Sequence, residues 1–195
     1  MERLQPTKKI DIDDSDLILT PIKGSDLNGI MNAINEKPED LMNAMPWVKT
    51  SRKIRPQIIN FVLESEIQSD CGEINLWSIK KTDTNELIGL IGVDNMTHQG
   101  GDLNFGYWVK YSFQKRGIAS KVIPEVLKWL SKVHNTKTLE ITVNPDNISG
   151  LATCKYIIRK MKLDENVFQE TILLHHNKKV LYHTYMFPLK NIYWG

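Results

Sequence analysis

The residues best suited to chemistry lie in one short segment, Gln114 to Ser120 (Gln-Lys-Arg-Gly-Ile-Ala-Ser), between an expected strand and an expected helix. The first N–H groups of a helix have no acceptor within it, and the helix dipole adds partial positive charge at that end. Gly117 lets a ligand approach the backbone closely, and Lys115 and Arg116 add two cationic side chains. The segment predicts a binding site for a pyrophosphate; the alternative is an ordinary strand–loop–helix connection.

The elements that must position this segment follow from hydrophobic periodicity. Turn residues at 82–85 and 99–101 join three strands as successive hairpins. A helix precedes strand 138–143, which makes that strand parallel to strand 102–109, and Pro124 should kink this helix or remove one of its hydrogen bonds. The pattern predicts a mixed α/β sheet with strands 17–20, 74–80, 87–93, 102–109, 138–143, 168–174 and 180–187, and helices 25–34, 55–68, 117–133 and 149–161.

Composition limits the class of protein. A chain of 195 residues with a net charge of +2 and no long basic run predicts neither a nucleic-acid nor a membrane partner. Two cysteines are too few for a disulfide framework, and from the sequence we expect neither a membrane-spanning segment nor a signal peptide. We expect a cytoplasmic monomer or homodimer, with residues 1–16 as a loose N-terminal arm and 17–195 as a single domain.

Several segments resemble the GCN5-related N-acetyltransferases (GNAT), and in particular the RimJ/RimL-type branch, which acetylates the N-termini of ribosomal proteins. The Gln-x-x-Gly-x-Ala pattern that begins at Gln114 is similar to the family loop that holds the pyrophosphate of acetyl-CoA. The resemblance implies the GNAT fold, a mostly antiparallel central sheet of about seven strands with about four helices. The other segments that carry it are Leu17–Pro21, Met45–Trp47, Leu87–Val93, Gly106–Trp108 and Asn144–Asn147.

The activity that the resemblance implies is transfer of acetyl from acetyl-CoA to a primary amine, on a protein N-terminus or a small molecule, without a metal. An amine attacks the thioester, a base takes its proton, and a backbone N–H stabilises the oxyanion. In the family this donor lies at the position of Val109, and Trp47 either lines the acceptor pocket or packs the first helices together. The implied cofactor-binding residues are Val109, Gln114, Lys115, Arg116, Gly117, Ile118, Ala119, Ser120 and Asn147.

Two positions depart from the family pattern. Asn104 stands where relatives usually have a glutamate that acts as the base or holds a catalytic water. An amide is no base at neutral pH, although it can position a water or an amine. Asp102 and His98 are the alternative bases, and Asp102 also suits a structural turn carboxylate.

The second departure concerns the acid that protonates the leaving thiolate. Gly150 occupies the position where the family has Ser or Ala. Ser149 is our choice for the acid, although it also suits a helix N-cap; Thr153 and Tyr156 are the competitors. Because both departures weaken the expected chemistry, the alternative function is an acyl-CoA-binding protein with weak or no transferase activity.

Overall fold

The computed structural model describes residues 4–39, 45, 47–49, 51–134, 136–163, 168–175 and 178–189. Its chain forms two compact units. The first consists of the chain up to Val93 together with Gly106–Glu125, and the second of Asp94–Phe105 together with the chain from Val126 onward. The chain crosses from one unit to the other within strand β5 (Leu103–Val109) and within helix α4 (Ile118–Val133).

The strands form an eight-stranded sheet in the order β1-β2-β3-β4-β5-β6-β8-β7. All the described pairings are antiparallel except that of β5 with β6, where Leu103 lies opposite Leu139. The first unit contains β1 (Ile10–Asp11), β2 (Leu17–Pro21), β3 (Asn75–Lys81) and most of β4 (Leu87–Asp94). This is the mixed, mostly antiparallel sheet that the sequence predicts, with one strand more than the expected seven.

The additional strand, β1, lies in the segment that was expected to be a loose arm. The prediction of a loose arm is wrong for its described part, because two side chains of β3 hold its backbone. The Asn75 Nδ2 atom donates to the carbonyl of Gln5 at 2.8 Å, and the Trp77 Nε1 atom donates to that of Lys8 at 2.7 Å. Asn75 and Trp77 are buried, so these bonds satisfy donors that water cannot reach.

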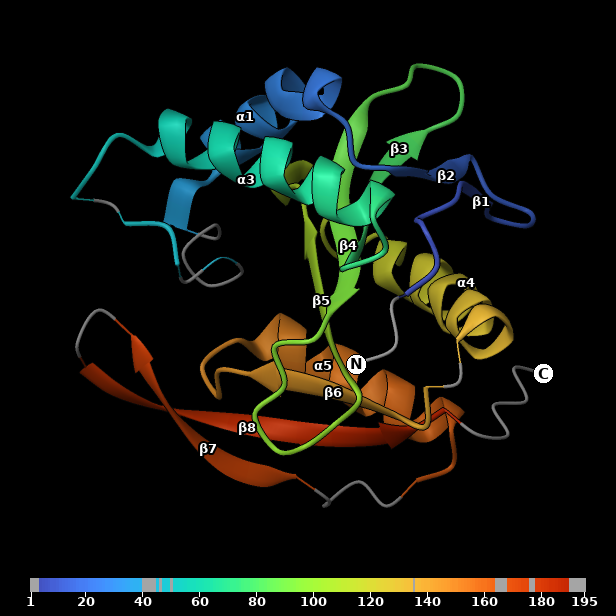
Figure 1. Cartoon of the computed structure of the whole chain (residues 1–195), viewed down its shortest axis with the longest axis vertical. Coiled ribbons are helices and arrows are strands. Elements are labelled where there is room, and N and C mark those ends of the chain that lie inside the picture. Colours follow the sequence, from blue (N-terminus) through green and yellow to red (C-terminus); the bar gives the residue numbers. More distant parts are fainter. Residues whose placement is uncertain are drawn as a thin grey trace. The chain divides into compact units, whose positions relative to one another are not determined.

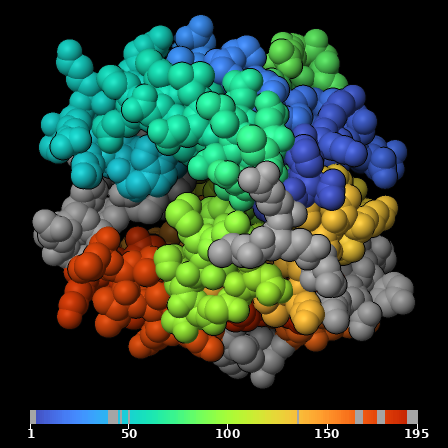
Figure 2. Space-filling model, in the orientation of Figure 1, coloured from blue at the N-terminus to red at the C-terminus, as the bar shows by residue number. Residues whose placement is uncertain are grey.

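Two helices cover the sheet of the first unit, α1 (Leu27–Glu36) and α3 (Ile54–Asp70), which lie side by side in Figure 1. Their apolar faces share a core with β4 and with Trp108 of β5. Each of these buried aliphatic side chains contributes about 1.5–3 kcal/mol relative to an exposed one. The outer face of α3 lies at the surface (Figure 2), where Leu63 and Ile67 are exposed.

The second unit contains β6 (Thr138–Val143), α5 (Ile148–Lys160), β7 (Gln169–His175) and β8 (Lys178–Pro188). Strand β8 lies between β6 and β7 and pairs antiparallel with both, which confirms the closing hairpin. Glu140 of β6 is fully buried and accepts hydrogen bonds from the backbone N–H groups of His98 at 2.6 Å and Gln99 at 2.9 Å. The carboxylate therefore fixes the loop of residues 95–101, which connects β4 to β5.

Helix α4 runs without interruption through Pro124. Because proline has no N–H group, one hydrogen bond of the helix is missing there, as the sequence predicts. Among the described residues, no helix is both long and apolar enough to cross a membrane.

Candidate functional site

The segment from Lys110 to Ser120, called here the cofactor loop after its predicted role, leads from β5 into the first turn of α4 within the first unit. Two of its residues have left-handed backbone conformations, Lys115 with φ of 60° and Gly117 with φ of 73°. Glycine is the residue that adopts this conformation most easily, and its missing side chain leaves the start of α4 open. Helix α4 begins at Ile118, directly after Gly117, so its unpaired first N–H groups lie at the predicted position.

Internal hydrogen bonds shape the cofactor loop. The Gln114 Nε2 atom donates to the carbonyl of Val109 at 3.0 Å, so the side chain ties the loop back to the end of β5. The hydroxyl of Ser120 donates to the carbonyl of Gly117 at 2.8 Å. Gln114 and Ser120 therefore support the conformation of the loop.

Helix α1 anchors the loop through Glu36. Its carboxylate accepts hydrogen bonds from the Ser112 backbone N–H at 3.0 Å and hydroxyl at 3.2 Å, and it forms an ion pair with Lys110 at 3.2 Å. Burial opposes ionisation of Glu36, but these contacts outweigh it and lower the pKa of the carboxyl group. Glu86 also contacts Lys110, at 2.6 Å, so two carboxylates neutralise this lysine.

Lys115 and Arg116 are different, because both are exposed. Neither forms an ion pair with a carboxylate within the described part of the chain, although Arg116 lies over the ring of Phe113 at 5.2 Å. Two uncompensated cations and the N-terminal end of a helix give this surface a positive potential. The arrangement is suited to binding a diphosphate.

Asn104, the predicted catalytic residue, contacts a carboxylate that sequence reasoning missed. Its Nδ2 atom lies 3.3 Å from an oxygen of Asp94, the last residue of β4, and the backbone N–H of Met96 donates to the same oxygen at 2.8 Å. Burial raises the pKa of Asp94, and the Met96 N–H, the Asn104 amide and the charge of His98 offset only part of this effect. A carboxylate with a raised pKa is a stronger base than an exposed one.

Asp102 is a structural turn carboxylate, the second of its two predicted roles. One of its oxygens accepts the backbone N–H groups of Lys137 at 2.7 Å and Thr138 at 2.9 Å. Burial opposes ionisation, but these bonds prevail and lower the pKa of Asp102. His98, the other alternative base, contributes its backbone N–H to Glu140 in the same unit.

Helix α5 starts at Ile148, and its N-cap is Asn147 rather than Ser149. The Oδ1 atom of Asn147 accepts the Gly150 N–H at 2.9 Å, which leaves the amide nitrogen as the group that can face a ligand. Ser149 is exposed, and its carbonyl accepts the Thr153 hydroxyl at 3.2 Å. The hydroxyl of Ser149 is therefore not used as the helix cap.

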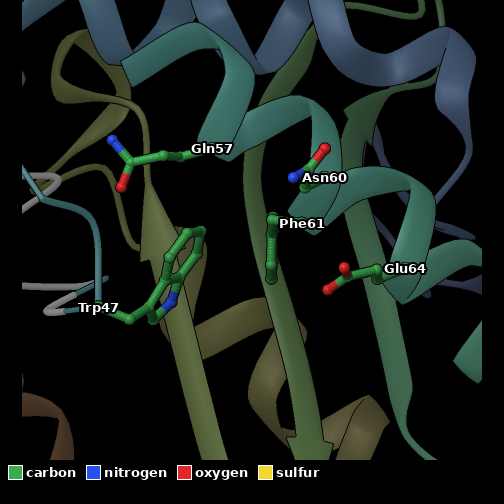
Figure 3. Close-up of a pocket in the computed structure, with 5 residues that line it drawn as sticks. All are labelled: Trp47, Gln57, Asn60, Phe61 and Glu64. Atoms are coloured by element: carbon green, nitrogen blue, oxygen red, sulfur yellow. The ribbon is translucent and has the colours of Figure 1, made fainter. Parts of the chain in front are cut away.

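Trp47 lines a pocket in the first unit with a volume of about 320 Å³. The other lining residues lie along one face of α3 (Figure 3), and the indole is 44% exposed. Side chains at positions 57, 60, 61 and 64 recur at helical spacing, which the sequence contains but does not connect to Trp47. Trp47 therefore packs against Phe61 of α3 and lines this pocket; that the pocket receives the acceptor stays a prediction. Within the described ranges, no group of residues could hold a metal ion.

A family model, the acetyltransferase (GNAT) domain, matches residues 16–155. The chain belongs to the GNAT acetyltransferase family. This confirms the sequence-based resemblance and makes the chain an acetyl-CoA-dependent N-acetyltransferase, with acetyl-CoA as its co-substrate. No observation favours the alternative of an acyl-CoA-binding protein without activity. No curated protein sequence matches the chain.

Solved structures of other acetyltransferases have the same fold as this GNAT chain. The microcin C7 self-immunity acetyltransferase MccE, solved with acetyl-CoA and AMP, is 18% identical with a TM-score of 0.71, over 95% of this chain and 98% of that one. Ribosomal-protein-S5-alanine acetyltransferase from Vibrio fischeri is 13% identical with a TM-score of 0.73, over 94% and 99%. RimL, the ribosomal L7/L12 α-N-protein acetyltransferase, solved with CoA, is 15% identical with a TM-score of 0.72, over 92% and 97%.

Proposed function

We propose that this enzyme acetylates a primary amine, either a protein N-terminus or a small molecule, and that the cofactor loop holds acetyl-CoA by its pyrophosphate. The observation that carries the proposal is the left-handed turn at Lys115 and Gly117, which opens the start of α4 beside two exposed cations. Ile118, Ala119 and Ser120 would supply the backbone N–H groups of the first helical turn, and Lys115 and Arg116 the charge.

Three further groups would position acetyl-CoA. The backbone N–H of Val109 would stabilise the oxyanion, and Gln114, which is bonded to the carbonyl of the same residue, would hold that segment in place. The amide nitrogen of Asn147 would donate to the cofactor, because the oxygen of this side chain is occupied as the helix cap.

Asp94 and Asn104 would together manage the proton of the amine. Asn104 cannot accept a proton at neutral pH, but it donates to the carboxylate of Asp94 and would fix its orientation. Burial raises the pKa of Asp94 and so improves it as a base, directly or through a water. Asn104 would be a positioning residue, and Asp94 would take the place of the glutamate that relatives have at position 104.

Ser149 would protonate the departing thiolate. Its hydroxyl lies in the first turn of α5 and is free of the capping role, which Asn147 fills. Burial raises the pKa of the competing Tyr156, which keeps that phenol protonated but makes it a weaker acid.

We also propose that residues 17–195 form one acetyltransferase domain that acts in the cytoplasm as a monomer or homodimer. The family match over residues 16–155 supports the domain, and two free cysteines, Cys71 and Cys154, are consistent with a reducing compartment.

Isothermal calorimetry with acetyl-CoA and with free CoA tests the proposal, followed by a screen of amines for release of the CoA thiol. We expect acetyl-CoA to bind with a Kd in the micromolar range, an affinity of about −8 kcal/mol. Thiol release with an N-terminal peptide or a small amine would identify the acceptor class. An absence of acetyl-CoA binding by a correctly folded protein would exclude the proposed role of the cofactor loop.

A further inference from the structure

Strand β7 is the outermost strand of the sheet and pairs on one side only. The strand order ends with β6-β8-β7, and Figure 1 shows β7 with β8 along one flank. Its register with β8 is regular, from Gln169 opposite Thr184 to His175 opposite Lys178. The backbone N–H and C=O groups that point away from β8 therefore have no strand to bond within the described part of the chain.

The sequence of β7 lacks the features that usually protect such an edge. Sheet edges in natural proteins are blocked by prolines, lysines or bulges, because an open edge pairs with another chain. The seven residues of β7, Gln-Glu-Thr-Ile-Leu-Leu-His, include no proline, glycine, lysine or arginine, and their one formal charge is that of Glu170. The regular register with β8 contains no bulge. The outer edge of β7 is therefore able to accept a further strand.

Apolar side chains lie exposed on one face of the β7–β8 hairpin. Ile172 is 65% exposed and Leu174 is 77% exposed, and Leu181, directly opposite Ile172 on β8, is 41% exposed. Residues two apart on a strand share a face, and the same face of β8 is buried further along, at Tyr185 and Phe187. The exposed side chains thus extend an apolar face that the chain itself covers only in part.

The geometry of the strand favours a second copy of the chain as the partner. Two β7 strands related by a two-fold axis perpendicular to the sheet run antiparallel, and each side chain stays on its own face. A register centred on Leu173 places Ile172 of each copy opposite Leu174 of the other, on the face that also carries Leu181. The apolar side chains of both copies then form one cluster, and the two Glu170 carboxylates lie at opposite ends of the contact.

Other pairings fit less well. A register centred on Ile172 would place Leu174 opposite the carboxylate of Glu170. The other edge strand of the sheet, β1, has only two residues and offers no comparable edge for a head-to-tail contact. Because a two-fold contact occupies the β7 edge of both copies, the assembly closes at two chains.

We propose that β7 is a homodimer interface, at which the strands of two copies pair antiparallel and join their sheets into one. This goes beyond the proposed function, which leaves monomer and homodimer open and does not involve β7. The contact is limited to one strand and one apolar patch from each copy, at the small end of specific interfaces, about 1,200 Å² or less. We therefore expect a Kd for the dimer of about 10 µM.

Sedimentation equilibrium of the full chain tests the interface over a range of about 1 to 300 µM, on either side of the expected Kd. A reductant is included because Cys71 is exposed. We expect the mass to rise from that of one chain to that of two. A monomer throughout the range, or assemblies that grow beyond two chains, would overturn the inference.

Ile172→Lys and Ile67→Lys form a matched pair of variants, since both isoleucines are 65% exposed. Ile172→Lys places a charge in the centre of the contact and should raise the Kd about 50-fold, because the change acts twice in a two-fold dimer. Ile67 lies on α3 in the other unit, so Ile67→Lys should dimerise as the wild type does. A dimer that survives Ile172→Lys, or that is weakened equally in both variants, would contradict the proposed interface.

Disulfide formation in a Cys71→Ser background checks the register. Leu173→Cys would lie at the two-fold axis, with about 4.5–5.5 Å between the two Cα atoms, within reach of a disulfide. Ile172→Cys would lie about 7–8 Å from its counterpart, which is too far. Mild oxidation followed by non-reducing electrophoresis should give a covalent dimer for Leu173→Cys alone, and any other pattern would overturn the proposed pairing.

Calorimetry with acetyl-CoA separates this inference from the proposed function. Ile172→Lys and Ile67→Lys should both bind acetyl-CoA as the wild type does, which also shows that they fold. If acetyl-CoA binds and the wild type stays monomeric, only the dimer inference fails. If the dimer forms through β7 while acetyl-CoA does not bind, only the proposed function fails.

Discussion

The cofactor loop lies between β5 and α4, and the loop of residues 95–101 lies between β4 and β5. The two loops are held in place in different ways. The part of the cofactor loop that leads into α4 takes its shape from local backbone conformation, with left-handed residues at Lys115 and Gly117 and a bond from Gln114 to Val109; Glu36 of α1 anchors its other end through Ser112. The 95–101 loop is held by Glu140, which is about forty residues away in sequence. The first arrangement leaves backbone N–H groups for a ligand, whereas the second uses them up within the protein.

Gly117→Glu should have the largest effect, because it places a carboxylate beside the free backbone N–H groups at the start of α4. The new carboxylate would meet the pyrophosphate, and a side chain at φ of 73° adds strain. We expect acetyl-CoA affinity to fall by about 1000-fold, or roughly 4 kcal/mol. Gly117→Ala, which adds strain without charge, is the control; calorimetry that gave Gly117→Glu the wild-type affinity would contradict the assignment.

Glu140→Ala tests the opposite side of the comparison, where a carboxylate holds a loop for structural reasons. The substitution would leave the backbone N–H groups of His98 and Gln99 without their acceptor and create a cavity at a fully buried site. We expect the free energy of unfolding in urea to fall by about 3 kcal/mol. Glu140→Gln, which keeps one acceptor oxygen, should lose less, and equal stability of Glu140→Ala and wild type would refute this account.

Asp94→Asn tests a carboxylate at the border of the 95–101 loop. Asp94 directly precedes this loop and accepts one backbone N–H group from it, that of Met96. We expect kcat to fall about 100-fold with acetyl-CoA affinity unchanged. Since burial raises the pKa of Asp94, the wild-type kcat/KM should fall with decreasing pH through a pKa above the ordinary 3.8, as the base becomes protonated.

The pH profile is the decisive readout for this residue. The acidic limb should vanish in Asp94→Asn and persist in Asn104→Ala, which removes only a donor to the carboxylate. A raised native pKa also means that protonated Asp94 favours the folded state below the ordinary pKa of 3.8. This contribution is lost as pH rises through the native pKa, so ionised Asp94 disfavours the folded state at neutral pH. Asp94→Asn should therefore be no less stable than wild type at pH 7; an unchanged kcat would remove Asp94 from the mechanism.

Ser149→Ala should have the smallest effect, since water can also protonate a thiolate. We expect kcat to fall about threefold with little change in CoA affinity, because the cap of α5 is Asn147 and does not depend on this hydroxyl. Steady-state rates of Ser149→Ala, Thr153→Val and Tyr156→Phe would be measured together. A larger loss in either of the last two would transfer the acid role to that residue.

The turn of the cofactor loop could be predicted from the sequence because the residues that form it are contiguous, whereas its anchor on α1, Glu36, could not. The turn, the cations and the start of α4 all follow one another along the chain, so the pattern of residue types was sufficient. The pairing of strands within each hairpin was predictable for a similar reason, since short turns force neighbours to pair, whereas the place of β8 between β6 and β7 was not. The N-terminal arm was misjudged because the residues that hold it, Asn75 and Trp77, lie some seventy positions away.

The proposed base could not be predicted in the same way. Asp94 ends one strand and Asn104 lies on the next, so their contact depends on strand register and on the loop between them. The role of Asp102 could be narrowed to two options but not decided, since its partners Lys137 and Thr138 come from a distant segment. The helical spacing of residues 57, 60, 61 and 64 on α3 can be read from the sequence. That they line a pocket depends on the packing of Trp47 on Phe61, which the sequence does not give.

The two cysteines have a practical consequence for work on this enzyme. Burial raises the pKa of the Cys154 thiol to about 12, whereas Cys71 is exposed just after α3. Because thiol reagents react with the thiolate, we expect Cys154 to react far more slowly than Cys71 with alkylating dyes at neutral pH. The unmodified sequence thus offers Cys71, the C-cap of α3, as the site for a fluorophore or spin label, without the introduction of a cysteine.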